Sequence, residues 1–276
     1  MGHLTIDRLA SGMRIGGSVA YAATTASRLG MVAGIATVTG QELEWASHLP
    51  GVEMVCQPAA ATTTFENLYR GGRRTQRVLA MAEPVSPGAV PPQWRTAPIV
   101  HLAPVLHEVS GDLPSMFSGS LIGLTPQGLL RRWDQTGAVS QSSWTGDDRL
   151  LAGAQVLVFS EEDVAGDPTF LSRCLDRTAI TILTEGAGGA TLFIEGRSTR
   201  FPAFPVEEID PTGAGDVFAA AFLIEYHLTG DPYHSTAFAC CAASFVVERP
   251  GLEGIPDRRQ VEQRLDIYNV RNLGRP

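Results

Sequence analysis

The stretch Ile209–Asp216, with the sequence IDPTGAGD, runs directly into the helix-favouring residues VFAAAFLIEYHL and decides how this chain is interpreted. Glycines at the start of a helix let the backbone curl, so that successive N–H groups point at one spot. The positive end of the helix dipole points at the same spot. The pattern therefore predicts an anion hole for a phosphate group, formed by Gly213, Ala214 and Gly215, with the carboxylate of Asp216 beside it.

A carboxylate beside such a hole can accept the proton of an attacking hydroxyl group. Phosphoryl transfer needs little more than positioning, charge stabilisation and a base of this kind. A purely structural explanation stays open, in which Thr212 caps an ordinary helix and Asp216 complements its dipole. The complete string is more specific than two glycines, and it favours the catalytic interpretation.

Strand-like and helix-like segments alternate along most of the chain. Residues 18–29 are rich in alanine and stop at Gly30, as helices often do. Buried strands are expected at residues 31–40, 154–160 and 179–186, and long helices at 214–228 and 231–247. This alternation is typical of an α/β fold with a mainly parallel sheet.

The pattern changes at residues 62–69 and 74–80, which are two β-prone runs joined by Arg70–Arg73, with the sequence RGGR. Glycines between two such runs predict a β-hairpin. A hairpin inside an α/β chain needs something to cover, so it predicts a small lid.

The composition excludes several classes of protein. The 276 residues are 44% hydrophobic and carry a net charge of −8, which supports a large core and argues against nucleic-acid binding. No apolar stretch is long enough to span a membrane, and no signal peptide is evident. The four cysteines lack metal-ligand spacing. We therefore expect a cytoplasmic protein that binds neither nucleic acid nor membrane.

The string DPTGAGD resembles the C-terminal signature of the ribokinase-like (PfkB) family of carbohydrate and nucleoside kinases. Four further markers occur in the order found in that family: Asp7 with the Gly16-Gly17 pair, the hairpin of residues 62–80, Ser160–Asp163, and Thr184–Ala190. The resemblance implies a ribokinase-like three-layer α/β/α fold with a mostly parallel central sheet and a small β lid. It also implies a single domain over residues 1–276, with a lid built from parts of 8–17 and 60–81.

The family implies ATP-dependent transfer of the γ-phosphate to a hydroxyl group of a small-molecule acceptor, with Mg²⁺ and a monovalent cation such as K⁺. Asp216 would be the base and Gly213, Ala214 and Gly215 the anion hole. Asp210 and Thr212 would help to hold the monovalent cation, with Thr212 also near the nucleotide. The remaining family positions divide into acceptor contacts (Asp7, Gly16, Gly17) and the lining of the ATP pocket (Thr184, Gly186, Gly189).

Two positions depart from the family pattern. Tyr21 stands where the family usually carries Asn, so we expect it to contact the acceptor by stacking on a ring. Ser160–Asp163 replaces the magnesium-associated N-x-x-E motif, which shortens the acid by one carbon. Contacts through water molecules would still allow Asp163 to act near Mg²⁺.

Some polar residues are candidates from their place alone. Gln127 and Arg131 follow a strand at 120–126, and ligands of open α/β sheets bind where strands end. Asn67 and Gln76 lie on the lid hairpin, where alternation of side chains leaves their direction open.

Two rival functions are considered. A family member without turnover would act as a nucleotide- or sugar-binding regulatory protein. A Rossmann oxidoreductase would need a G-x-G-x-x-G motif after the first strand, which is missing. Within the kinase interpretation the acceptor is a sugar, a cyclitol or a nucleoside, and the lid-to-lid contacts usual in the family imply that a homodimer is possible.

Overall fold

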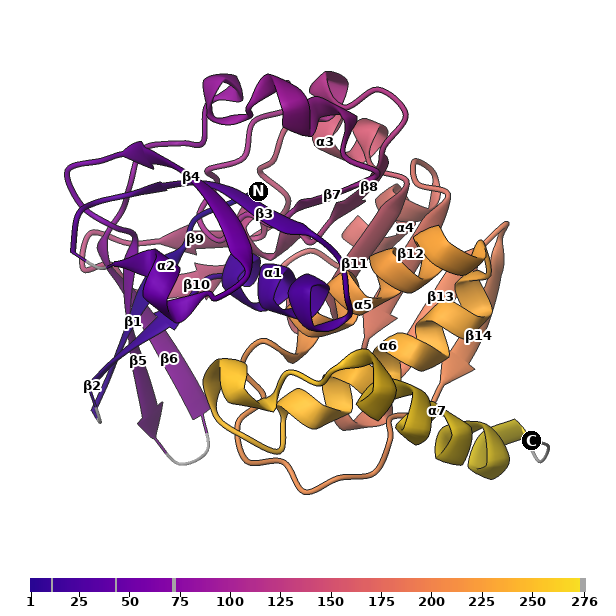
Figure 1. Cartoon of the computed structure of the whole chain (residues 1–276). Helices are drawn as coiled ribbons and strands as arrows, with labels where there is room; N and C mark the ends of the chain where they lie inside the picture. Colours follow the sequence, from indigo (N-terminus) through magenta and orange to yellow (C-terminus); the bar gives the residue numbers. More distant parts are fainter. Residues whose placement is uncertain (11, 43, 71–72, 274–276) are drawn as a thin grey trace.

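The computed structural model describes residues 1–10, 12–42, 44–70 and 73–273 and shows an α/β architecture (Figure 1). The strands are β1 (Thr5–Leu9), β2 (Gly12–Gly16), β3 (Ala33–Thr39), β4 (Val52–Pro58), β5 (Thr64–Arg70), β6 (Arg73–Ala80), β7 (Ile99–Leu102), β8 (Leu121–Leu124), β9 (Arg131–Trp133), β10 (Val139–Gln141), β11 (Val156–Ser160), β12 (Ile180–Thr184), β13 (Ala190–Ile194) and β14 (Arg197–Phe201). The α-helices are α1 (Ser18–Arg28), α2 (Trp45–His48), α3 (Asp148–Gly153), α4 (Phe170–Leu175), α5 (Ala214–Thr229), α6 (Pro232–Val246) and α7 (Arg258–Leu273).

The central sheet has six strands in the order β14-β13-β12-β11-β8-β7. The four strands from β7 to β12 pair in parallel, whereas β13 and β14 form an antiparallel hairpin at one edge. Parallel strands need crossover connections, and the helical segments between them supply these. The expected mostly parallel sheet is confirmed.

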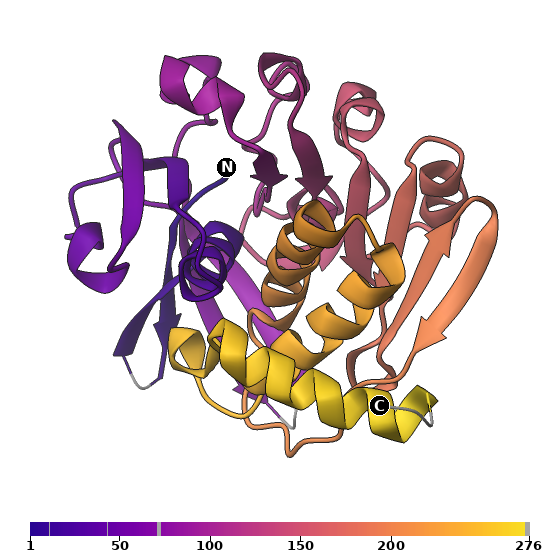
Figure 2. The same ribbon diagram turned by 45° about the vertical axis from the view of Figure 1, so that its right-hand side comes forward.

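Helices cover both faces of this sheet, because its strands are apolar on both sides. In β11, Val156 and Val158 pack into the core beneath α5, α6 and α7. Leu157 and Phe159 point the other way and pack with residues of α3 and α4. Figure 2 shows α5 and α6 in front of the sheet with α7 crossing below them. The expected three layers are present.

A second sheet, of order β2-β1-β5-β6, forms what we call the lid sheet. The hairpin of β5 and β6 lies where the sequence predicts it, and its glycine turn, Gly71 and Gly72, falls outside the described residues. The strand β1 pairs antiparallel with β2 and parallel with β5, so Asp7 lies opposite both Arg14 and Phe65. That β1 belongs to this sheet was not foreseen, since the lid was expected to begin at residue 8.

The pair β3–β4 stands apart from the central sheet, contrary to the single sheet that the strand pattern indicated. Residues 1–4 run between the β3–β4 pair and the central sheet. Ala103, after β7, donates its N–H to the carbonyl oxygen of Met1 at 2.8 Å, and Gly2 donates to Ala36 of β3 at 3.4 Å. These few bonds link the two parts without forming a regular ladder.

The C-terminal helix α7 was not predicted, because most of its residues are polar. Its buried side chains are Val261, Leu265 and Tyr268, which recur at intervals of four and three residues. This spacing marks one face of a helix and was the available signal. Between β3 and β4 the chain forms the short helix α2.

Two of the expectations drawn from the sequence concern membrane-spanning segments and the four cysteines. No helix in the described part of the chain is long and apolar enough to cross a membrane. Cys56 is exposed, Cys174, Cys240 and Cys241 are buried, and all four thiols are free.

The loop after β7 supports the lid sheet. Val105 and Leu106 pack against Phe65 of β5 in a small apolar cluster. The buried carboxylate of Glu108 holds this loop by accepting the N–H groups of His3 at 2.9 Å, of Val105 at 2.8 Å and of Leu106 at 2.7 Å. Glu108 thereby links His3 to the loop that supports the lid sheet.

We predict that Glu108→Ala lowers the free energy of unfolding by at least about 2 kcal/mol, because three buried N–H groups lose their acceptor. Chemical denaturation measures this change. Glu53→Ala, at an exposed glutamate of β4, is the matched control and should change stability by no more than about 0.5 kcal/mol. Equal effects of the two substitutions would contradict the supporting role of Glu108.

Candidate active site

The N-termini of α1 and α5 meet at one place. Gly17 precedes α1 with φ +92°, and Gly213 precedes α5 with φ +83°, a left-handed conformation that favours glycine. Tyr21, in the first turns of α1, packs its ring on Gly213, where an added Cβ would lie 2.2 Å from the ring. Two positive helix ends therefore converge on the same point, which suits an anion.

The first turn of α5 carries the residues expected for catalysis. Gly215 is exposed, and a Cβ built on it meets no protein atom within 4 Å. Ala214 and Asp216 are half-buried on either side of it. The backbone at Gly215 thus faces open space beside the carboxylate of Asp216.

The loop before α5 is tied to distant parts of the chain. Val247, after α6, accepts the N–H groups of Ile209 at 2.7 Å and Asp210 at 3.1 Å. The carboxylate of Asp210 accepts the N–H of Thr212 at 3.0 Å through Oδ1 and Nη1 of Arg14 at 2.9 Å through Oδ2. These bonds hold the pKa of Asp210 below its ordinary value despite the opposing effect of burial.

The charged groups that shift the pKa of Tyr21 show which side chains lie near it. Burial raises the pKa of its phenol far above the ordinary value. The nearby positive charge of Arg14 acts in the opposite direction. The carboxylates that raise this pKa further are those of Asp7, Asp210 and Asp216. The lid acid Asp7, the loop acid Asp210 and the helix acid Asp216 therefore all lie near the Tyr21 phenol.

Asp7 projects from the face of the lid sheet that carries Arg14 and Gly16. The pairing places Arg14 directly across from Asp7, so both side chains lie on one face. An added Cβ on Gly16 would come within 2.5 Å of Asp7 Oδ2, which explains why the position requires glycine. Gly17 is restricted in the same way, since its Cβ would lie 2.4 Å from the carbonyl oxygen of His3.

The same face of the lid carries Asn67. Its side chain is buried and accepts a hydrogen bond at 3.0 Å from Gln76, directly across the hairpin. Gln76 in turn accepts from Arg131 of β9 at 3.4 Å. The direction of Asn67 and Gln76, open from the sequence, is thus inward. Gln127 lies in the 3₁₀ turn Pro126–Leu129 that follows β8, at the end of the strand.

Tyr21 does not present an open ring face. It is 2% exposed, with Gly213 against the ring, and its hydroxyl group has no hydrogen-bond partner among the described residues. The expected stacking on an acceptor ring has no counterpart in this arrangement. What the residue offers instead is a protonated, buried phenol.

The segment expected to bind nucleotide is the turn between β12 and β13. Thr184 ends β12, and Gly186 and Gly189 have φ +54° and +100° in the turn that follows. A Cβ on Gly189 would lie 2.0 Å from the carbonyl oxygen of Phe201. The close approach of β14 therefore requires a glycine at position 189 for the fold itself, apart from any role in binding a nucleotide.

Asp163 lies just beyond β11, next to Thr184 of the neighbouring strand. Oδ2 of Asp163 accepts the N–H of Ser160 at 2.9 Å and its hydroxyl at 2.8 Å. These two hydrogen bonds hold Oδ2 of Asp163 at the end of β11. Across the described residues, no group of three or more His, Cys, Asp or Glu side chains could hold a metal ion.

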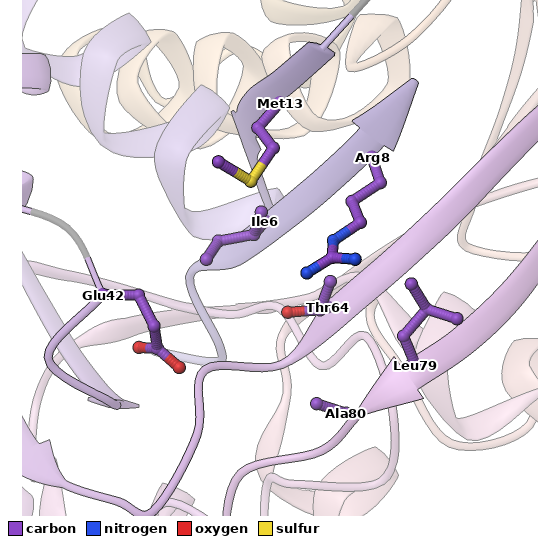
Figure 3. A pocket seen from close by; sticks show the side chains of 7 residues that line it. All are labelled: Ile6, Arg8, Met13, Glu42, Thr64, Leu79 and Ala80. Atoms are coloured by element: carbon purple, nitrogen blue, oxygen red, sulfur yellow. The ribbon is translucent and has the colours of Figure 1, made fainter. Parts of the chain in front are cut away.

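A hollow of about 560 Å³ lies on the other face of the lid sheet (Figure 3). Side chains alternate along a strand, so Ile6 and Arg8 point away from Asp7. The hollow is therefore separate from the site described above. Its lining consists of Ile6, Arg8, Met13, Glu42, Thr64, Leu79 and Ala80.

Arg14 is the residue that the sequence interpretation missed. It lies on the lid strand β2 and contacts a loop 196 residues later in the chain. A periodic reading of the strand could have placed it beside Asp7, but its bond to Asp210 depends on the tertiary structure.

Comparisons with known proteins agree with this geometry. Residues 149–258 match the family described as pfkB family carbohydrate kinase. A probable fructokinase-5 of Arabidopsis thaliana is 26% identical over 151 residues, which cover 50% of this chain and 47% of that protein. The chain thus spans about half the length of this curated relative. Other relatives bear the names of nucleoside and inositol kinases.

Solved structures with the same fold cover nearly the whole chain. A pyrophosphate-dependent kinase in the ribokinase family, complexed with a pyrophosphate analogue and myo-inositol, has a TM-score of 0.75 at 21% identity, covering 95% of this chain and 98% of that one. A ribokinase of Arabidopsis thaliana, complexed with ribose and ATP, has a TM-score of 0.72 at 19% identity, covering 95% and 96%. The fold of this chain is therefore that of ribokinase-family kinases, and residues 149–258 match the pfkB carbohydrate kinase family.

Proposed function

We propose that this protein is an ATP-dependent kinase that phosphorylates a hydroxyl group of a small polyhydroxylated molecule. One observation supports this most strongly. The open backbone of Gly215 and the carboxylate of Asp216 lie at a convergence of two helix N-termini, and the lid carboxylate Asp7 shares the same electrostatic surroundings.

In the proposed reaction the lid holds the acceptor and α5 holds the transferred phosphoryl group. Asp7 accepts hydrogen bonds from hydroxyl groups of the acceptor molecule, and Asn67 accepts or donates them. The attacking oxygen forms a bond to the γ-phosphorus of ATP as the bond from that phosphorus to the β,γ-bridging oxygen breaks. Asp216 takes the proton of the hydroxyl group, and ADP leaves. The N–H groups from Gly213 to Gly215 stabilise charge on the phosphoryl oxygens.

The donor would lie along the ends of β11 and β12, with Thr184, Gly186, Gly189 and Thr212 as its contacts. Mg²⁺ usually keeps several waters and binds through substrate phosphates, which suits a site without a cluster of protein ligands. Asp163 would contact the ion through water, and the ion would neutralise phosphate charge. The ATP complex of the related fold supports this donor, while the pyrophosphate-dependent relative makes pyrophosphate the donor to test beside ATP.

The acceptor class follows from the polar groups on the inner face of the lid and from Tyr21 of α1. A carboxylate at Asp7, an amide at Asn67 and a buried phenol at Tyr21 suit a molecule with several hydroxyl groups. Sugars, cyclitols and nucleosides meet this description, and names of relatives cover all three. A thermal-shift screen of such compounds with a nonhydrolysable ATP analogue identifies the acceptor, and a coupled assay for ADP confirms turnover.

The rival proposal is a regulatory binding protein without turnover. It requires that the site bind ligands but lack the base or the anion hole. Asp216 and the open backbone at Gly215 are both present, so the kinase is favoured. A cytoplasmic location remains a proposal, supported by the four free thiols.

A homodimer through the outer face of the lid sheet also remains a prediction. This face exposes Met13 by 67% and Leu79 by 43%. Sedimentation velocity at high micromolar concentration should show a dimer, and Leu79→Asp should shift it toward monomer. A wild-type protein that sediments only as a monomer would rule this prediction out.

We predict that Asp216→Asn lowers turnover by about 10²–10⁴-fold, because the side chain keeps its shape but loses the proton acceptor. ATP affinity should stay within a few fold of wild type. A steady-state assay and a melting curve on the same preparation check both points. If Asp216 served only as a partner of the helix dipole, turnover would be nearly normal and stability would fall by about 0.3–1 kcal/mol.

We predict that Gly215→Ala separates folding from donor binding. The added Cβ meets no protein atom, and alanine favours a helix over glycine by up to about 1 kcal/mol, so the melting temperature should hold or rise. The same Cβ would occupy the space proposed for the phosphoryl group, so donor affinity and turnover should fall at least about tenfold. Gly213→Ala is the contrasting control, since its Cβ would clash with Tyr21 and destabilise the fold. An active Gly215→Ala variant would place the anion hole elsewhere.

A further inference from the structure

The family resemblance implies a monovalent cation beside Asp210, and the structure gives reason to doubt that fit. Oδ1 of Asp210 accepts the N–H of Thr212 at 3.0 Å, and Oδ2 accepts Nη1 of Arg14 at 2.9 Å. The nearby carbonyl oxygen of Val247 already accepts two N–H groups, those of Ile209 and Asp210. Both carboxylate oxygens of Asp210, the acid expected to serve an ion, are thus engaged within the protein.

Arg14 is held firmly in this position. Its side chain is 22% exposed and that of Asp210 is 16% exposed, so the pair is largely shielded from water. The stem of Arg14 passes over Gly251, where an added Cβ would come within 3.2 Å of Cδ. Burial opposes the charge of Arg14, but its bond to Asp210 and the negative charges of Asp210 and Asp7 more than compensate and raise its pKa.

We propose that the guanidinium group of Arg14 provides the positive charge that a monovalent cation would otherwise supply beside Asp210. This inference rests on the proposed kinase function. Arg14 is then a positioning residue: it neutralises Asp210 and so holds the loop that leads into Gly213 and α5. A guanidinium and a potassium ion carry the same charge, but the guanidinium is fixed by the fold and independent of salt composition.

The position of Arg14 adds a second consequence. Arg14 belongs to β2 of the lid sheet, whereas Asp210 belongs to the loop before α5. The charge that steadies the anion hole therefore comes from the lid. An ion bound only by the loop before α5 would not connect that loop to the lid sheet.

The test compares K⁺ with choline at constant ionic strength, using two readouts. The first is the melting temperature of the ligand-free protein, and the second is the steady-state rate with an accepted acceptor. For the wild-type protein, the rate should change less than about twofold and the melting temperature less than about 1 °C, since no ion binds.

Removing the guanidinium should create a dependence on K⁺. In choline, Arg14→Ala should lose at least about tenfold in turnover, because Asp210 is left uncompensated beside the site. Added K⁺ should restore most of this loss and raise the melting temperature by about 2–4 °C at ten times its dissociation constant. Arg14→Lys keeps the charge and should remain insensitive to K⁺.

Two controls localise the effect. Arg8→Ala removes an exposed arginine from the opposite face of the same lid and should behave as wild type in both salts. Arg14→Ala combined with Asp210→Asn removes the carboxylate that would receive the ion, so the response to K⁺ should disappear.

The proposal is overturned by a wild-type protein that K⁺ activates more than about tenfold or stabilises by more than about 2 °C. It is equally overturned if folded Arg14→Ala gains nothing from K⁺ in either readout. Should Arg14→Ala fail to fold, the wild-type and Arg14→Lys measurements still decide. If no acceptor is phosphorylated, the kinase proposal fails by itself, and the melting temperatures still show whether an ion binds.

Discussion

The close approach of α1 and α5 depends on the absence of a side chain at Gly213. The ring of Tyr21 occupies the space that a Cβ would need, at 2.2 Å, and the positive φ of Gly213 turns the chain into α5 at that contact. Any other residue would push the two helix N-termini apart. With them would move Asp216, Gly215 and the loop that carries Asp210, so one missing methyl group sets the geometry of the candidate site.

Because side chains alternate along each strand, the lid sheet has two faces with different residues. Asp7, Arg14 and Asn67 face inward, while Arg8 and Met13 face outward. A hollow lies on the outward face, whereas the charged groups and the helix N-termini lie on the inward face. The inward face is therefore the better candidate for chemistry.

Local signals in the sequence were enough to predict much of the fold. The strand β11, the lid hairpin and the helices α5 and α6 follow from apolar runs, glycine turns and alanine content over adjacent residues. The separation of β3 and β4 from the central sheet could not be predicted, because it depends on a few bonds from residues 1–4 to two different strands. Likewise, α7 is too polar to stand out, and only its three buried residues reveal which face it packs.

The candidate site likewise contains some residues that could be identified from the sequence and others that could not. The string IDPTGAGD and the Gly16-Gly17 pair could be identified from the sequence, because the backbone chemistry they supply lies within a few residues. The inward direction of Asn67 and the burial of Tyr21 needed the three-dimensional structure. The bond between Arg14 and Asp210 is the extreme case, since it joins residues 196 positions apart.

The bond between Arg14 and Asp210 also affects the balance of charge in the candidate site. Asp7, Asp210 and Asp216 each raise the pKa of the Tyr21 phenol, so three negative charges lie near this one residue. Arg14 places a positive charge among them, between the lid strand and the loop before α5. Any motion that separates the lid sheet from α5 must lengthen this bond and leave Asp210 less neutralised. The charge balance of the candidate site is thus tied to the position of the lid, which is the element proposed to hold the acceptor.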